Sequence, residues 1–139
     1  MTGRAFVDTN VVVYAYELKA SDRQATARSL LCQGLAQETA VLSTQVLSEF
    51  YVVVTRKSAD PLTPEQARRA VDALAPMLAV GQDLTLVRRA IDAHTEYGLS
   101  YWDGLIVAAA ERARCQRLLS EDLNPGQRYF GIPVENPFA

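Results

Sequence analysis

The chain has 139 residues, of which 49% are hydrophobic and 22% are charged, and its formal net charge is −2 at pH 7. This length and apolar content suit one compact domain, because half of the chain could not bury enough apolar surface to fold alone. The near-neutral charge excludes a protein that attracts nucleic acid through a global basic field.

Short apolar runs alternate along the chain with segments of helical periodicity. The runs predicted to be buried strands are residues 5–7, 40–43, 77–80, 117–120 and 132–135. The segments predicted to be helices begin near residues 9, 21, 44, 63, 83 or 85, and 102. Apolar strands without alternation, separated by helices, indicate a parallel sheet covered on both faces. The predicted class is therefore α/β, with more helix than strand.

Capping residues support several of these helix ends. Ser21 and Gln24 fit a capping box, in which each side chain binds the other residue's backbone N–H. Thr63 followed by Pro64 is typical of a helix start, and Gly98 is typical of a helix end. No repeat or low-complexity linker interrupts the chain, so a single domain is expected.

The two cysteines, Cys32 and Cys115, lie among apolar neighbours without the spacing of metal ligands. This pattern favours reduced thiols in a cytoplasmic protein. No apolar run approaches the length of a membrane span, so we expect a soluble protein with no membrane partner.

Four acidic residues are placed where the predicted elements begin or end. Asp8 follows the first strand, Glu49 lies on the helix after the second strand, Asp103 opens the last helix, and Asp122 follows the next strand. In open parallel sheets, ligand sites form beyond the carboxyl ends of the strands. We therefore expect the four carboxylates to converge on one pocket at the edge of the sheet.

Each acid also has an ordinary structural explanation. Asp8 and Asp103 could cap helices, and Asp122 could begin a turn. Glu49 is the hardest to explain in this way, because Val46, Val52 and Val53 lie three or four residues away from it on the helix. A carboxylate on an apolar stripe needs a counter-charge or a water-filled cleft.

Four carboxylates that share a pocket cannot all stay ionised unless cations offset their repulsion. Carboxylate oxygens and water suit Mg²⁺ or Mn²⁺, and the chain has no His or Cys cluster that would favour zinc. Such ions activate water and stabilise charge on a phosphoryl group. The acids therefore predict metal-assisted hydrolysis of a phosphodiester bond.

The segments AFVDTNVVVYA, STQVLSEFY, LSYWDGLIVAAA, LLSEDL and VENPF, in this order, resemble the PIN-domain ribonucleases, specifically the VapC-type toxins of prokaryotic toxin–antitoxin pairs. The resemblance spans about residues 5–138. It implies a PIN-like three-layer sandwich, in which a central short parallel sheet of about four to five strands is flanked by helices. It also implies a single PIN domain over residues 1–139.

The resemblance assigns roles to individual residues. The acids that bind the metal and act in catalysis would be Asp8, Glu49, Asp103 and Asp122. Thr9 and Asn10 would fix the carboxylate of Asp8, and Ser120, standing where the family often has threonine, would orient metal-bound water. Glu121 lies next to Asp122, so either residue could be the fourth acid.

The function implied is a Mg²⁺- or Mn²⁺-dependent endoribonuclease that acts as the toxin of a toxin–antitoxin pair. Its partners would be an RNA substrate, a cognate VapB-like antitoxin and a second copy of the chain in a homodimer. Tyr101 and Trp102, beside Asp103, could stack on an RNA base, although packing in the core or at an interface explains them more simply.

Two other functions stay open. A catalytically silent PIN-like module would bind RNA or protein, and would be expected to have lost some of the acids. A metal-dependent phosphatase also places an aspartate after the first strand, but Asn10 stands where such an enzyme would have a second acid.

Overall fold

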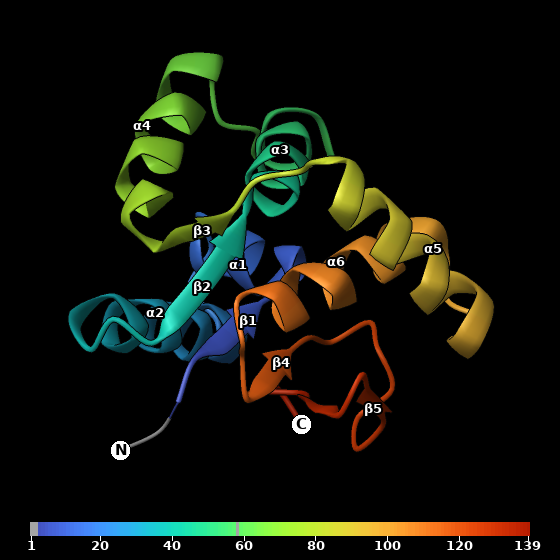
Figure 1. Cartoon of the computed structure of the whole chain (residues 1–139). Coiled ribbons are helices and arrows are strands. Elements are labelled where there is room, and N and C mark those ends of the chain that lie inside the picture. Colours follow the sequence, from blue (N-terminus) through green and yellow to red (C-terminus); the bar gives the residue numbers. More distant parts are fainter. Residues whose placement is uncertain (1–2, 58) are drawn as a thin grey trace.

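A computed structural model of the chain describes residues 3–57 and 59–139. In these residues one six-stranded sheet has the order β3-β2-β1-β4-β6-β5 (Figure 1). The strands are β1 (Ala5–Val7), β2 (Ala40–Ser43), β3 (Leu78–Val80), β4 (Arg117–Leu119), β5 (Arg128–Tyr129) and β6 (Ile132–Glu135). The first strand of the chain therefore lies inside the sheet, between β2 and β4.

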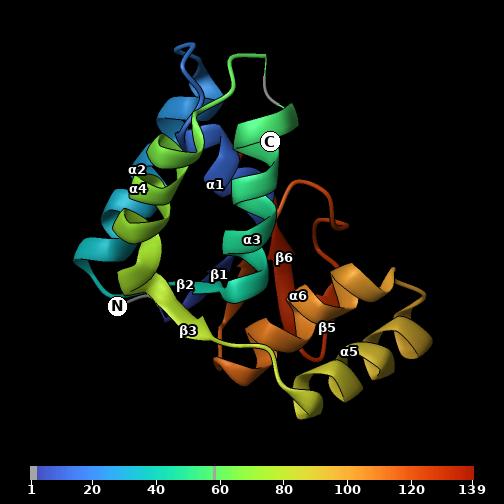
Figure 2. The same ribbon diagram turned by 90° about the horizontal axis from the view of Figure 1, so that it is seen from above.

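The helices cover both faces of this sheet. They are α1 (Thr9–Ala15), α2 (Asp22–Ala36), α3 (Thr44–Val52), α4 (Pro64–Leu74), α5 (Leu84–Tyr97) and α6 (Tyr101–Arg112). A π-helical turn, η1 (Val53–Lys57), continues α3, and a 3-10 turn, η2 (Ala75–Met77), follows α4. Seen from above, α1 and α2 lie on one side of the strands and α5 and α6 on the other (Figure 2).

The predicted α/β class and mostly parallel sheet are confirmed. Strands β3, β2, β1, β4 and β6 pair in parallel, and they are the five apolar runs that the sequence indicated, within one residue at each end. β5 was not predicted, because it is a two-residue antiparallel partner of β6 inside a turn-rich segment. Short strands without an apolar run carry little sequence signal.

The helix caps are mostly those expected. Thr63 and Gln66 form both bonds of a capping box, at 3.1 and 2.9 Å. Ser21 accepts a bond from the backbone N–H of Gln24, but the Gln24 side chain donates to the carbonyl of Glu17 instead of closing the box. The predicted box at the start of α2 is therefore only half formed.

The core is built around β1 and α6. All three residues of β1 are buried, and so is every residue of α6 from 104 to 110. Gly104 allows α6 to lie against α5, because a Cβ at this position would come within 2.6 Å of the carbonyl oxygen of Ala90. In the described part of the chain, no helix is both long and apolar enough to cross a membrane.

The sheet order brings the ends of separate strands together. The backbone N–H of Asp8 donates to the carbonyl of Leu119 at 3.0 Å, which continues the pairing of β1 with β4 by one residue. Ser120 directly follows β4, and its backbone N–H donates to the carbonyl of Glu135 at 3.0 Å. The first candidate acid therefore lies beside the segment that carries the last one.

Candidate active site

Asp8 lies at the centre of the candidate site. Its side chain is only 6% exposed, and it is the N-cap of α1. One carboxylate oxygen accepts a bond from the backbone N–H of Thr9 at 2.7 Å, and the other accepts a bond from the Ser120 hydroxyl at 2.7 Å. The helix-capping role and the site role are therefore compatible, because each carboxylate oxygen keeps a second lone pair for another partner.

Ser120 joins the end of β1 to the segment after β4. Its side chain is fully buried, and its hydroxyl donates to Asp8. The same oxygen lies 3.2 Å from the backbone nitrogen of Asp122 and 3.3 Å from that of Leu123, both of which donate to it. One hydroxyl thus fixes a carboxylate on one strand and the turn that carries another.

Glu49 enters the site from α3 through two side-chain contacts. The Thr9 hydroxyl donates to one of its oxygens at 2.6 Å, and the Gln45 amide donates to the other at 3.2 Å. The sequence suggested an apolar stripe around Glu49, but Val52 on that stripe is exposed and Glu49 itself is half-buried. The glutamate therefore lies at the wall of a cleft and not in the core.

Asp103 reaches the same region from the first turn of α6. Its backbone N–H donates to the hydroxyl of Ser100, the N-cap, at 3.1 Å, which is one of the two bonds of the capping box that Ser100 and Asp103 could form. Gln45 connects this turn to α3, because its amide also donates to the carbonyl of Trp102 at 3.1 Å. Asp103 is half-buried, and α6 presents it toward the other acids.

The charges of the acids act on one another. The pKa of Asp8 is raised from 3.8 to about 6, and the largest cause is burial. The charges of Asp122 and Asp103 also raise this pKa, whereas the bonds from Ser120 and Thr9 lower it. Burial also raises the pKa of Asp103, the bond from Ser100 lowers it, and the charges of Asp122 and Glu49 raise it. The charge of Asp103 therefore acts together with those of Asp122 and Glu49, and Asp8 feels the charges of Asp122 and Asp103, which four separate helix caps would not require.

Two of the four acids line a cavity of about 580 Å³, whereas Asp8 and Asp103 are not among its lining residues. Glu49 and Asp122 line it together with Thr9 and Asn10. The amide nitrogen and the amide oxygen of Asn10 are both buried and have no partner among the described residues. Buried polar groups are nearly always paired, so these atoms indicate a polar ligand or ordered water in the cavity.

The donor set fits a hard divalent cation. It consists of carboxylate and amide oxygens, and no histidine or cysteine lines the cavity. In residues 3–57 and 59–139, no group of three or more His, Cys, Asp and Glu side chains is arranged so that it could hold a metal ion. Mg²⁺ does not need such a group, because it usually binds one or two protein carboxylates and keeps several waters.

Gln45 is the residue of this site that sequence analysis missed. It precedes Glu49 by four residues on α3, so the two side chains share a helix face. That spacing was the available signal. The second contact of Gln45, with the Trp102 carbonyl, joins residues 57 positions apart and had no local signature.

Trp102 does not pack in the core. Its side chain is 60% exposed, so packing in the core is excluded, while packing at an interface stays a prediction. The ring makes an edge contact with Tyr101, with 5.0 Å between the centroids. In this chain, therefore, the aromatic surface beside Asp103 faces outward.

A sheet of this order, with a buried aspartate at the end of its inner strand and further acids near it, defines a PIN-like α/β protein. The model of the PIN domain family matches residues 5–129, and the chain belongs to this family. Among curated proteins, none matches the chain.

Several solved structures share the fold at low sequence identity. VapBC2 from Rickettsia felis, bound to a fragment of its promoter DNA, is 22% identical with a TM-score of 0.67, covering 95% of this chain and 97% of that one. A toxin–antitoxin complex from Klebsiella pneumoniae is 21% identical with a TM-score of 0.65, covering 96% and 97%. VapC20 from Mycobacterium tuberculosis, a toxin that cleaves the sarcin-ricin loop, is 19% identical with a TM-score of 0.62, covering 85% and 89%.

Proposed function

We propose that the protein is a Mg²⁺- or Mn²⁺-dependent endoribonuclease that acts as the toxin of a toxin–antitoxin pair. The observation that carries the proposal is the buried carboxylate of Asp8, held by Ser120 and Thr9 and surrounded by the charges of other acids. Such an arrangement is costly without a cation, because burial and like charges both oppose ionisation. Membership of the PIN domain family and the toxin structures of the same fold support it.

The residues proposed to hold the metal are Asp8, Glu49, Asp103 and Asp122. When bound, Mg²⁺ or Mn²⁺ would activate water and stabilise charge on the phosphoryl group. Ser120 and Thr9 would keep the carboxylates oriented, since each hydroxyl already donates to one of them at 2.7 or 2.6 Å. The product expected from such hydrolysis carries a 5′-phosphate.

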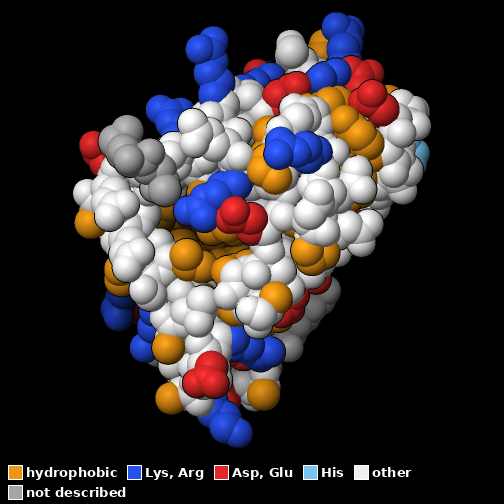
Figure 3. Space-filling view, turned by 90° about the horizontal axis from the view of Figure 1, so that it is seen from below, with side chains coloured by type: hydrophobic (Ala, Val, Ile, Leu, Met, Phe, Trp, Pro, Cys, Tyr) orange, Lys and Arg blue, Asp and Glu red, His pale blue; other side chains and the backbone are white. Residues whose placement is uncertain are grey.

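The proposed substrate is RNA with an unpaired base near the cleaved bond. The exposed ring of Trp102, one residue from Asp103, offers a surface on which a base can stack. The formal charge of −2 becomes +2 when the four acids are set aside as metal-bound, so the remaining surface is slightly basic. Acidic and basic side chains are mixed on the face seen from below, around a hollow where hydrophobic side chains show (Figure 3).

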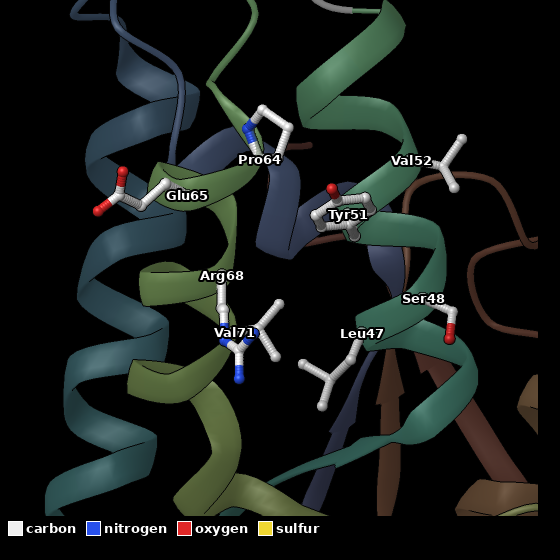
Figure 4. A pocket seen from close by; sticks show the side chains of 8 residues that line it. All are labelled: Leu47, Ser48, Tyr51, Val52, Pro64, Glu65, Arg68 and Val71. Carbon is white, nitrogen blue, oxygen red and sulfur yellow. The ribbon is translucent and has the colours of Figure 1, made fainter.

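The proposed protein partner is a VapB-like antitoxin. A groove between α3 and α4 could receive a peptide, and Leu47, Tyr51 and Val71 line its apolar part (Figure 4). Ser48 and Val52 line both this groove and the acidic cavity, so the two hollows are adjacent. The VapBC complexes of the same fold favour this class of partner.

We also propose a homodimer of single PIN domains in the cytoplasm. The hydrophobic core of the described residues is one continuous cluster, which supports a single domain over residues 1–139. Leu84 and Ile91, two turns apart on α5, are exposed and would suit an interface between copies. Cys32 and Cys115 are free thiols, which suits a reducing compartment.

The competing functions predict different sites. A catalytically silent binding module has no need of a buried Asp8 near other acids. Burial and the neighbouring charges both oppose the ionisation of the Asp8 carboxyl group. A phosphatase with a second acid two residues after Asp8 does not suit this chain, since Asn10 occupies that position. The ribonuclease proposal is the one that uses all four acids.

The test is cleavage of labelled structured RNA by purified protein with Mn²⁺, with EDTA, and with Asp8→Asn and Asp103→Asn. Asp72→Asn, which replaces an exposed carboxylate on α4, is the matched control. We expect the wild type and the control to cleave only with Mn²⁺, and both site variants to lose cleavage. Cleavage that survives in either site variant refutes the proposal, and RNA binding without cleavage by the wild type supports the binding module.

A further inference from the structure

A hydrogen bond at the rim of the site connects α1 with the segment that carries the last acid. The hydroxyl of Tyr14, on α1, donates to a carboxylate oxygen of Glu121. The two residues are 107 positions apart in the sequence, and Glu121 is the neighbour of Asp122. The contact therefore involves Glu121, one of the two residues that the sequence offered as the fourth acid.

The Tyr14 ring is itself held on more than one side. The guanidinium of Arg23 lies over the ring at 4.1 Å from its centroid, and Arg23 makes two bonds to Glu17, at 2.8 and 2.7 Å. Phe138 meets the ring edge-on at 5.1 Å between centroids. A ring with these contacts has a defined position, so its hydroxyl presents a fixed donor to Glu121.

The other side of the same segment is fixed from within. Asp122 and Leu123 donate their backbone N–H groups to the buried hydroxyl of Ser120, and the Leu123 side chain is buried in the core. Asp122 lines the acidic cavity together with Glu49 and Tyr14, whereas Glu121 is bound to the Tyr14 hydroxyl. The two adjacent acids thus have different partners and different surroundings.

We propose that Tyr14 is a positioning residue: by binding Glu121 it holds the segment after β4 so that Asp122, and not Glu121, faces the other acids. This inference rests on the proposed metal site. Glu121 serves as the acceptor that attaches the segment to α1, and its negative charge is not used by the metal. Tyr14 acts through this attachment and does not itself contact the reacting phosphate.

The test measures Mn²⁺ affinity directly, from the electron paramagnetic resonance signal of free Mn²⁺, so that it does not depend on activity. Tyr14→Phe removes the donor and keeps the ring with its Arg23 and Phe138 contacts. Glu121→Ala removes the acceptor, whereas Glu121→Gln keeps an acceptor oxygen and removes the charge. Tyr97→Phe is the matched control, because its hydroxyl accepts a bond from the backbone of Phe130, at 2.8 Å, in the same β4–β6 connection.

We expect Tyr14→Phe and Glu121→Ala each to raise the Kd for Mn²⁺ by about 10-fold, the lower end of the effect of residues that support metal ligands. The double variant should bind no more weakly than either single variant, because both changes remove one contact. Glu121→Gln and Tyr97→Phe should bind Mn²⁺ as the wild type does. Thermal melting of each variant confirms that folded protein is compared.

Two results overturn the inference while leaving the metal site in place. A wild-type Kd in Tyr14→Phe means that the hydroxyl positions nothing. A Kd raised as much in Glu121→Gln as in Glu121→Ala means that the Glu121 charge serves the metal itself. Failure of the wild type to bind Mn²⁺, or unchanged binding in Asp8→Asn, instead refutes the proposed function and this inference with it.

Discussion

Replacement of Asp8 by asparagine is expected to remove about 3 kcal/mol of pH-dependent destabilisation from the metal-free protein at neutral pH. The carboxyl group is 6% exposed, and burial raises its pKa from 3.8 to about 6. Asparagine has the same shape without the charge. Its carbonyl oxygen can accept the bond from the Thr9 N–H, but the Ser120 hydroxyl loses its acceptor, because the Ser120 oxygen already accepts two backbone N–H groups and has no lone pair left for the asparagine amide. This loss is the same at every pH, so it changes the free energy of unfolding by a constant amount.

The magnitude and its sign follow from the pKa in the folded and unfolded chain. The pKa of Asp8 is higher in the folded chain than in the unfolded chain. The protonated carboxyl group therefore contributes stability that is fully present below about pH 4 and is lost as the pH rises through about 6. The interval between 3.8 and about 6, at about 1.4 kcal/mol for each pH unit, corresponds to about 3 kcal/mol at pH 7. The uncharged variant escapes this loss.

The assay is urea unfolding of wild type and Asp8→Asn in EDTA at pH 4, 5, 6 and 7. We expect the free energy of unfolding of the variant, relative to that of the wild type, to rise by about 3 kcal/mol between pH 4 and pH 7. Asp72→Asn is the control, because its exposed carboxylate on α4 should change the free energy of unfolding by less than about 1 kcal/mol at each pH. A difference between wild type and Asp8→Asn that does not change with pH would show that the Asp8 charge is not costly.

Three further predictions concern other parts of the molecule. Ser120→Ala removes a hydrogen bond that lowers the pKa of Asp8. The pH at which Mn²⁺ binding is half-maximal should therefore rise, which Mn²⁺ titration between pH 5 and 8 measures. Gly104→Ala should destabilise the protein by about 1 to 3 kcal/mol in urea unfolding, because its methyl group would lie 2.6 Å from the Ala90 carbonyl oxygen, whereas Gly81→Ala meets nothing within 4 Å. Trp102→Ala should raise KM for RNA more than it lowers kcat. RNA binding should also quench the fluorescence of the wild type, whose single tryptophan is Trp102. Unchanged KM and fluorescence would exclude base stacking on this ring.

Most of the elements follow from local sequence. Apolar runs predicted the five parallel strands, and Thr63, Asp83 and Gly98 mark helix ends where they were expected. These features depend on neighbouring residues, because strand burial and helix capping involve contacts within a few positions. The box at Ser21 is only half formed, since the Gln24 side chain donates to the carbonyl of Glu17, outside its helix, and does not accept from the Ser21 N–H.

The candidate acids were identifiable because each follows a strand or opens a helix at the end of a parallel sheet. Their convergence was an inference from topology, and the contacts of Asp8, Glu49 and Asp103 agree with it. Their catalytic roles stay predictions, which the cleavage assay tests. The exposure of Trp102 could not be predicted, because the fraction of an aromatic side chain that is buried depends on what the rest of the fold places over it.

The sequence by itself determined the order of strands and helices, the residues that cap them and the four acids at their ends, since all of these depend on short-range patterns. Only the tertiary structure decided which side chains meet: Ser120 with Asp8, 112 residues apart, and Tyr14 with Glu121, 107 residues apart. The physical reason is that a hydrogen bond is directional and short, so it depends on how the strands pair and how the helices pack. No local pattern records that arrangement.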